Sequence, residues 1–274
     1  MTLPSAACPV PRTSFREDRP SEGERTVAEE TPVALTYNRT TYAVMMATPS
    51  DIEDFAVGFS LTERMIGKPE ELEDLEVLAV PDGIEARMWL APDRIDAVER
   101  RRRQIAGATG CGLCGLESLA EAARPPTPVR GDLRVDPASL RSAIRALGSR
   151  QQLNHATHAV HAAGFWRPEP GLMAVREDVG RHNALDKLAG ALARAGISAS
   201  DGVVLLTSRI SVELVQKTAA MGAPMIAAVS APTALAIRTA DAAAITLAGI
   251  TRDDGFELFT HPRRIIREAA DAPD

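Results

Sequence analysis

The stretch Arg176–Leu188, REDVGRHNALDKL, decides the fold because a strand ends and a helix begins within it. The run Leu172–Arg176 is typical of a strand, and His182–Ala195 repeats apolar residues at helical spacing. Three further strand-like runs then alternate with two helical segments, in the order Val203–Thr207, Val212–Met221, Met225–Val229, Thr233–Ala242 and Ile245–Ile250. Short β-branched runs alternating with helices predict an α/β layered fold whose sheet is largely parallel in its second half.

The chain before this stretch divides into smaller units. Residues 1–26 lack an apolar period and are expected to be a disordered leader, and residues 27–105 are expected to form a small α+β subdomain. In that subdomain two hairpins flank one helix, which a capping box at Ser50–Glu53 opens and Gly67 ends. Residues 106–128 are predicted to be a mobile cysteine loop and a linker. The α/β domain is predicted for residues 129–274, with a strand at His158–Phe165 and a helix that Asp136 caps.

Composition and charge limit the function. The 274 residues carry a formal net charge of −6, which argues against general binding to nucleic acid or to an anionic membrane. No stretch reaches the roughly 20 apolar residues of a membrane span, and the N-terminus lacks the pattern of a secretory signal. We therefore expect a cytoplasmic protein.

The polar run is also the first candidate for a ligand site. It lies at the carboxyl end of a strand, where ligands bind in parallel α/β sheets, and helix-opening amides there attract phosphate. Gly180 permits a tight turn, and Arg181, His182 and Lys187 suit an anionic ligand. Ser208 and Arg209 follow the next strand, so the same edge of the sheet should gather them.

A second candidate is the glycine-rich loop GATGCGLCG, which holds Cys111 and Cys114. Zinc would need two further ligands, and no second cysteine pair exists. His155, His158 and His161 are spaced by three, but two of them fall in a strand-like run and would point to opposite faces. A zinc deaminase would need His-x-Glu and a proline before the first cysteine, and neither is present.

Two chemistries remain open for the cysteine pair from its residues alone. A dithiol redox protein places such a pair where a strand passes into a helix, whereas here the pair lies in a loop. A sulfur carrier needs an accessible thiol of low pKa on a segment with reach, which glycines provide.

Taken together, the motifs resemble the FdhD family, the sulfurtransferase accessory proteins of formate dehydrogenase. The resemblance runs over about residues 30 to 260 and rests on these segments: DIEDFAVGF (51–59), GCGLCG (110–115), REDVGRHNALDKL (176–188), TSR (207–209), ELVQK (213–217) and VSAPTALA (229–236). It implies a three-layer sheet domain like that of cytidine deaminases without the zinc ligands.

The resemblance also implies a sulfurtransferase activity. A cysteine desulfurase would load Cys111 as a persulfide, with Cys114 auxiliary. The sulfur would pass to Mo-bis(molybdopterin guanine dinucleotide), which formate dehydrogenase then receives. A non-sulfurating cofactor chaperone is the remaining alternative. The implied carrier is a homodimer, for which the apolar surface Leu235–Ala244 is a candidate interface.

The expected cofactor site combines two sets of residues. The resemblance places one set after the last strand, where Gly255 stands in place of a second basic residue: Ile250, Thr251, Arg252, Asp253, Asp254 and Gly255. The strand ends supply the other set: Arg176, Asp178, Gly180, Arg181, His182, Asn183, Lys187, Ser208 and Arg209.

Overall fold

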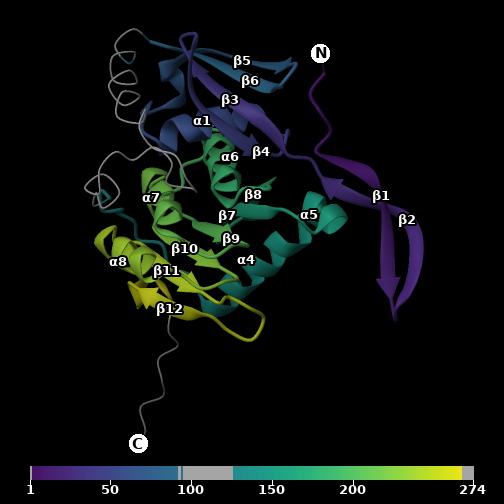
Figure 1. Cartoon of the computed structure of the whole chain (residues 1–274). Coiled ribbons are helices and arrows are strands. Elements are labelled where there is room, and N and C mark those ends of the chain that lie inside the picture. Colours follow the sequence, from purple (N-terminus) through teal and green to yellow (C-terminus); the bar gives the residue numbers. More distant parts are fainter. Residues whose placement is uncertain (1, 92–93, 95–125, 267–274) are drawn as a thin grey trace, which may run out of the picture.

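The computed structural model of the chain describes residues 2–91, 94 and 126–266, and it contains three sheets (Figure 1). The loop that holds Cys111 and Cys114 lies outside the described residues. None of the helices in the described part is both long and apolar enough to cross a membrane.

The largest sheet has six strands in the order β12-β11-β10-β9-β7-β8. Their bounds are β7 His161–Arg167, β8 Gly171–Asp178, β9 Val203–Leu206, β10 Met225–Ala228, β11 Thr246–Gly249 and β12 Glu257–Thr260. Only β9, β10 and β11 are parallel, whereas β7, β8 and β12 pair antiparallel with their neighbours. The prediction of a largely parallel sheet therefore holds for the three central strands. Short connections, which cannot cross over a sheet, reverse the chain before β8 and β12.

Helices cover both faces of this sheet, as the three-layer expectation required. Helices α6 (Arg181–Arg194), α7 (Val212–Ala220) and α8 (Ala234–Ala242) bury one face, and α4 (Pro137–Ser149) lies against the other. Alternate residues of β9 show this division, because Val204 belongs to the core under α6–α8 and Val203 to the core under α4. Asp136 caps α4 as predicted, since its carboxylate accepts from the backbone nitrogen of Ser139.

The N-terminal unit is a four-stranded sheet with one helix. The strands β3 (Thr31–Tyr37), β4 (Thr40–Ala47), β5 (Leu72–Val80) and β6 (Gly83–Leu90) have the order β4-β3-β6-β5. Helix α1 (Ile52–Thr62) buries Phe55 and Phe59 against them. The predicted hairpins and helix are present, but the capping box is wrong. The N-cap is Asp51, one residue later than predicted, and its side chain makes no capping bond; Glu53 pairs with Arg194 instead of folding back.

Helix α1 packs directly on α6, which joins the two units. A methyl group on Gly58 would lie 1.7 Å from the carbonyl oxygen of Asp186, and one on Gly190 would lie 1.9 Å from that of Asp54. The two backbones approach this closely only because both residues lack a Cβ. The four-stranded sheet and the six-stranded sheet thus lie on either side of a tightly packed helix pair (Figure 1).

The first residues correct the expectation of a disordered leader. Strands β1 (Ala7–Arg16) and β2 (Arg19–Ala28) form an antiparallel hairpin that projects from the body (Figure 1). Apolar alternation is missing because most residues of this hairpin are exposed, and backbone pairing needs no such pattern. The short helix α5 (Gln152–Thr157) lies at its base, and two single-turn 3-10 helices complete the fold, η1 Pro69–Glu71 and η2 Pro262–Arg264.

Candidate anion site at the strand ends

The loops that follow β9, β10 and β11 meet at one edge of the six-stranded sheet. Backbone hydrogen bonds tie them together, among them one from the nitrogen of Ile210 to the carbonyl of Ala231 and one from the nitrogen of Ile250 to the carbonyl of Ser230. The nitrogen of Ala162, in β7, donates to Thr207 Oγ1 at the same edge. The predicted convergence of these strand ends is therefore confirmed.

Two arginines give this edge a positive charge. Burial lowers the pKa of Arg181, and the charge of nearby Arg209 lowers it further, whereas Glu213 raises it. The Nε atom of Arg181 is buried, and no group of the described residues accepts a hydrogen bond from it. A buried donor without a partner costs free energy unless a ligand or water satisfies it, so this guanidinium suits an anion.

Two histidines and one carboxylate lie beside the arginines. His182 Nε2 is 3.4 Å from Ser211 Oγ and 3.8 Å from Glu213 Oε2. The neighbouring His182 lowers the pKa of Glu213 to about 2, against the opposing effect of burial. Burial lowers the pKa of His161, and Arg181 and His182 lower it further, whereas Asp178 raises it. Glu213 is thus an ionised carboxylate beside Arg181 and His182.

Two helix N-termini add backbone donors. Helix α6 begins after Gly180 and α7 begins after Ser211, and neither N-cap residue caps its helix with a side-chain hydrogen bond. By contrast, Thr233 caps α8 through its hydroxyl. Amides of an uncapped first turn carry partial positive charge, so α6 and α7 reinforce the arginines in favouring an anion.

Several residues of the predicted site are instead buried and bonded within the protein. Lys187 Nζ lies 2.7 Å from Asp178 Oδ2 and donates to the carbonyl of Thr48, and both charged side chains are fully buried. Asn183 Nδ2 donates to the carbonyl of Met46 and to Asp178 Oδ1. These contacts tie the start of α6 to the end of β4, and the side chains have no surface to offer a ligand.

Arg176 and Gly180 also have structural partners. Arg176 Nη2 lies 2.6 Å from Asp54 Oδ2, so it links β8 to α1. The nitrogen of Gly180 donates to Asp178, and a methyl group at Gly180 would lie 2.8 Å from Asn183 Nδ2. The tight turn predicted at Gly180 is present, and α6 begins directly after it.

The stretch after β11 contains two unusual features. Ile250 has a φ of 51°, which is strained for a β-branched residue. Thr251 is fully buried, and its hydroxyl has no hydrogen-bond partner among the described residues. The nitrogen of Arg252 donates to Gly255, so Arg252–Gly255 is a turn, and the side chains of Arg252, Asp253 and Asp254 are exposed. Strain beside an unpartnered buried hydroxyl is typical of a functional site.

Of the two remaining predicted residues, one is exposed at the edge and the other is buried. Arg209 is exposed, whereas Ser208 is buried and its hydroxyl lies against the carbonyl of Arg209. Sequence reasoning did not place His161 and Glu213 in the site. His161 was considered only as a zinc ligand, and it begins β7, whereas His155 belongs to α5 and His158 follows it. The acidic first turn of α7 was the available signal for Glu213.

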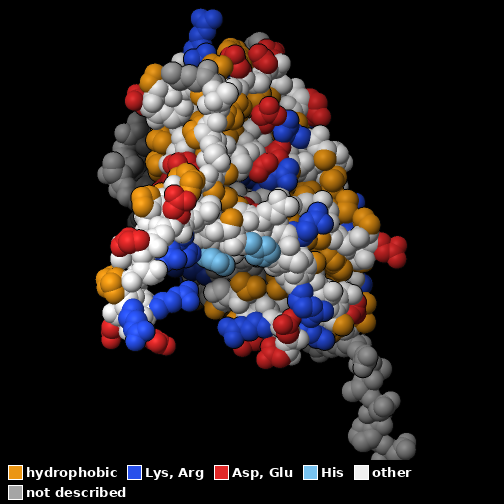
Figure 2. Space-filling model, turned by 90° about the vertical axis from the view of Figure 1, so that its right-hand side faces the viewer, with side chains coloured by type: hydrophobic (Ala, Val, Ile, Leu, Met, Phe, Trp, Pro, Cys, Tyr) orange, Lys and Arg blue, Asp and Glu red, His pale blue; other side chains and the backbone are white. Residues whose placement is uncertain are grey.

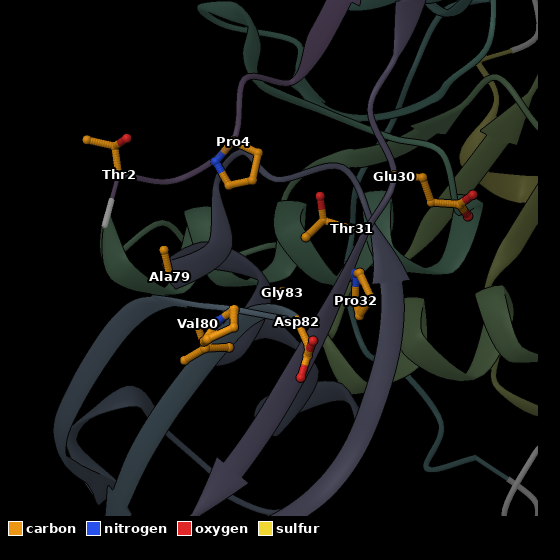
Figure 3. A pocket seen from close by; sticks show the side chains of 10 residues that line it. Thr2, Pro4, Glu30, Thr31, Pro32, Ala79, Val80, Asp82 and Gly83 are labelled. Carbon is orange, nitrogen blue, oxygen red and sulfur yellow. The ribbon is translucent and has the colours of Figure 1, made fainter.

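A hollow of about 530 Å³ lies elsewhere, between the N-terminal residues and the β5–β6 turn. Pro4, Pro32 and Val80 surround it, with Glu30 and Asp82 as its charged side chains (Figure 3). No Lys or Arg is among the described residues that line it, so the candidate for an anion remains the strand-end edge.

Comparisons with known proteins agree on one family. The family model described as FdhD/NarQ matches residues 28–266. The sulfur carrier protein FdhD of Agrobacterium fabrum is 53% identical over 94% of this chain and 95% of its own length. That of Cupriavidus necator is 50% identical over 89% of this chain and 85% of its own.

A solved structure shares the fold. The crystal structure of a protein from Desulfotalea psychrophila, described as a formate dehydrogenase accessory protein, superposes with a TM-score of 0.77 at 28% identity. The match covers 95% of this chain and all of the other. The family resemblance seen in the motifs is confirmed, and the chain belongs to the FdhD/NarQ family.

Proposed function

We propose that this protein is a sulfur carrier that supplies sulfur to the molybdenum cofactor of a formate dehydrogenase. Family membership over residues 28–266, beside relatives named as sulfur carriers, is the observation that carries this proposal. Cys111 is the proposed sulfur-bearing residue. It lies outside the described residues, so its role rests on the GCGLCG motif.

The loading step moves one sulfur atom without net oxidation. The Cys111 thiolate attacks the terminal sulfur of a persulfide on a cysteine desulfurase. A new sulfur–sulfur bond forms at Cys111, the donor's sulfur–sulfur bond breaks, and the donor leaves as a thiolate that takes up a proton. Delivery as sulfide needs two electrons. The Cys114 thiol supplies them by closing a disulfide with Cys111 as hydrosulfide departs, which gives Cys114 its auxiliary role.

The proposed acceptor is Mo-bis(molybdopterin guanine dinucleotide), held as cargo at the strand-end edge. Arg181 and Arg209 lie close together there, with an unpartnered Nε and two uncapped helix N-termini. Guanidinium groups and helix-opening amides are the donors that phosphate prefers. We assign the phosphate contacts to Arg181, Arg209 and His182, with the Ile250–Gly255 stretch beside them. Asp178, Asn183 and Lys187 support this edge from within.

Mass spectrometry of the loop peptide tests the sulfur-bearing role. After incubation with cysteine and a desulfurase, the wild type should gain one sulfur atom, about 32 mass units, on the peptide that holds Cys111. Cys111→Ala should gain none and should leave formate dehydrogenase inactive in cells. Cys8→Ala is the matched control, because that cysteine lies in β1 and should have no effect on either readout.

The same variants separate the alternatives. A dithiol redox protein would lose two hydrogen atoms on oxidation and gain no sulfur. A cofactor chaperone without sulfur transfer would still activate the client with both loop cysteines removed. Equal loss of activity in Cys111→Ala and Cys114→Ala, without a sulfur adduct on the wild type, would contradict the proposal.

A further inference from the structure

The β1–β2 hairpin has no buried residue in either strand. Its strands pair from Ala7–Ala28 to Arg16–Arg19, and a turn at Glu17 and Asp18 closes it. Most of its residues are exposed, and Phe15 near the tip is 70% exposed. An isolated two-stranded hairpin is only marginally stable in water, so an arm of this length indicates a purpose outside the protein's own core.

The register of the hairpin separates its charges onto two faces. Side chains alternate along a strand, and directly paired residues of antiparallel strands share a face. Because Arg16 pairs with Arg19 and Val10 pairs with Arg25, one face carries all four arginines of the hairpin, Arg12, Arg16, Arg19 and Arg25. The reverse face carries Glu22 and Glu24, with Thr13 donating to Glu22. We call the first of these the arginine face.

The arginine face turns toward the body at α5. Arg25 Nη2 donates to the carbonyl of Thr157, in the last turn of that helix. His155 and His158 are exposed at the same place. Figure 2 views the molecule from the side where the hairpin projects, and it shows Lys and Arg side chains gathered near histidines beside a hollow.

The outer three arginines lack partners. Arg12, Arg16 and Arg19 are exposed, and within the described residues no carboxylate lies within ion-pair distance of them. By contrast, Arg176 and Arg194 are paired with Asp54 and Glu53. Unpaired charges of one sign on one face attract a partner of the opposite sign.

We propose that the arginine face docks an extended acidic segment of a partner protein. Charge complementarity is the reason, since four cations lie on one face of the hairpin and none of the paired strand positions on that face holds a carboxylate. A peptide fits this surface better than a nucleic acid. Within the described residues each strand of the two-stranded sheet β1-β2 has an outer edge without a strand partner, and an extended peptide backbone can pair there. This surface is separate from the strand-end edge and does not depend on the sulfur-carrier role.

Fluorescence anisotropy with a labelled decapeptide of glutamate tests the proposal. The full chain should bind this probe, and the affinity should fall as salt rises. The variant Arg12→Ser/Arg16→Ser/Arg19→Ser should bind at least about tenfold more weakly. The matched control is Glu22→Ser/Glu24→Ser on the reverse face of the same hairpin, and it should bind equally well or better. Circular dichroism should show that both variants keep the wild-type fold.

Three kinds of measurement could overturn the proposal, and the first of them could do so in two ways. One is an absence of binding by the wild type, or an equal loss in the two variants. Another is tighter binding of a single-stranded RNA decamer than of the peptide, which would assign the face to nucleic acid. The third comes from sedimentation. A wild-type dimer that the arginine variant dissociates would show that a second copy of this chain occupies the face.

Discussion

One run of thirteen residues, Arg176–Leu188, contains two groups of polar side chains with different surroundings. Asp178, Asn183 and Lys187 are buried and bonded to the end of β4, whereas Arg181 and His182 face the strand-end edge. All five are polar and equally conspicuous in the sequence. The difference arises from what lies opposite each side chain, and that is a segment about 130 residues earlier in the chain. A polar-rich run in the sequence therefore indicates a functional region, but it does not tell which of its residues support the fold and which bind a ligand.

The supporting group is costly to disturb because it is buried. Asp178 accepts from the nitrogen of Thr48, from that of Gly180 and from Asn183, while Lys187 balances its charge. Burial lowers the pKa of Lys187, and Asp178 opposes that effect. A buried ion pair of this kind adds little net stability, but losing one partner leaves an uncompensated charge.

The largest effect is expected from Lys187→Ala, which leaves the carboxylate of Asp178 buried without its counter-ion. The free energy of unfolding should fall by about 3–5 kcal/mol. Urea denaturation followed by circular dichroism measures this change. The double variant Lys187→Met/Asp178→Asn removes both charges while keeping the volume, and it should lose less than the single variant. An unchanged urea midpoint for Lys187→Ala would show that the buried group contributes no more to stability than Arg181 and His182 do.

Arg181→Ala should weaken ligand binding and leave the stability of the fold nearly unchanged. The guanidinium makes little contribution to folding, so the urea midpoint should stay close to that of the wild type. Affinity for guanosine diphosphate, used as a probe for the cargo, should fall about thirtyfold, or about 2 kcal/mol. Isothermal titration calorimetry measures both the affinity and the stoichiometry.

Arg167→Ala is the matched control for that measurement. Arg167 ends β7 beside the start of β9, at the opposite edge of the same sheet, and pairs with Asp201. Its loss should leave nucleotide affinity unchanged. Equal weakening by both substitutions, or by neither, would remove the phosphate contact from the strand-end edge.

Local patterns predicted much of the fold. The alternation of strands and helices over Val203–Ile250 is present with boundaries within a residue or two, because apolar periodicity follows directly from burial. The errors lie in strands that are held by backbone hydrogen bonds and lack a periodic pattern of apolar residues. The exposed hairpin β1–β2 and the edge strand β12 are held by backbone bonds and carry no strong apolar signal. The predicted capping box is also absent, since the N-cap is one residue later and Glu53 pairs with a distant residue, Arg194.

The sequence predicted the kind of site and its place in the fold better than it predicted which side chains contact each other there. The sequence indicated an anion site at the strand ends, and the structure brings Arg181 and Arg209 close together there. The involvement of Glu213 could not be read from its spacing, because its partner His182 lies on another helix, 31 residues earlier. The phosphate-binding role of this edge stays a prediction that the variants above test.

The smallest effect is expected from Glu213→Gln, which removes the carboxylate that lies beside Arg181 and His182. The folded pKa of Glu213, about 2, lies below the ordinary value of 4.5. The ionised carboxylate therefore stabilises the fold above about pH 4.5, and this contribution disappears as the pH falls toward 2. At about pH 6 the variant should be less stable by about 1 kcal/mol, a figure reduced for partial exposure, and near pH 2 the two proteins should converge. Urea midpoints measured across this range provide the test. A constant difference at every pH would mean that Glu213 acts through packing and not through its charge beside His182.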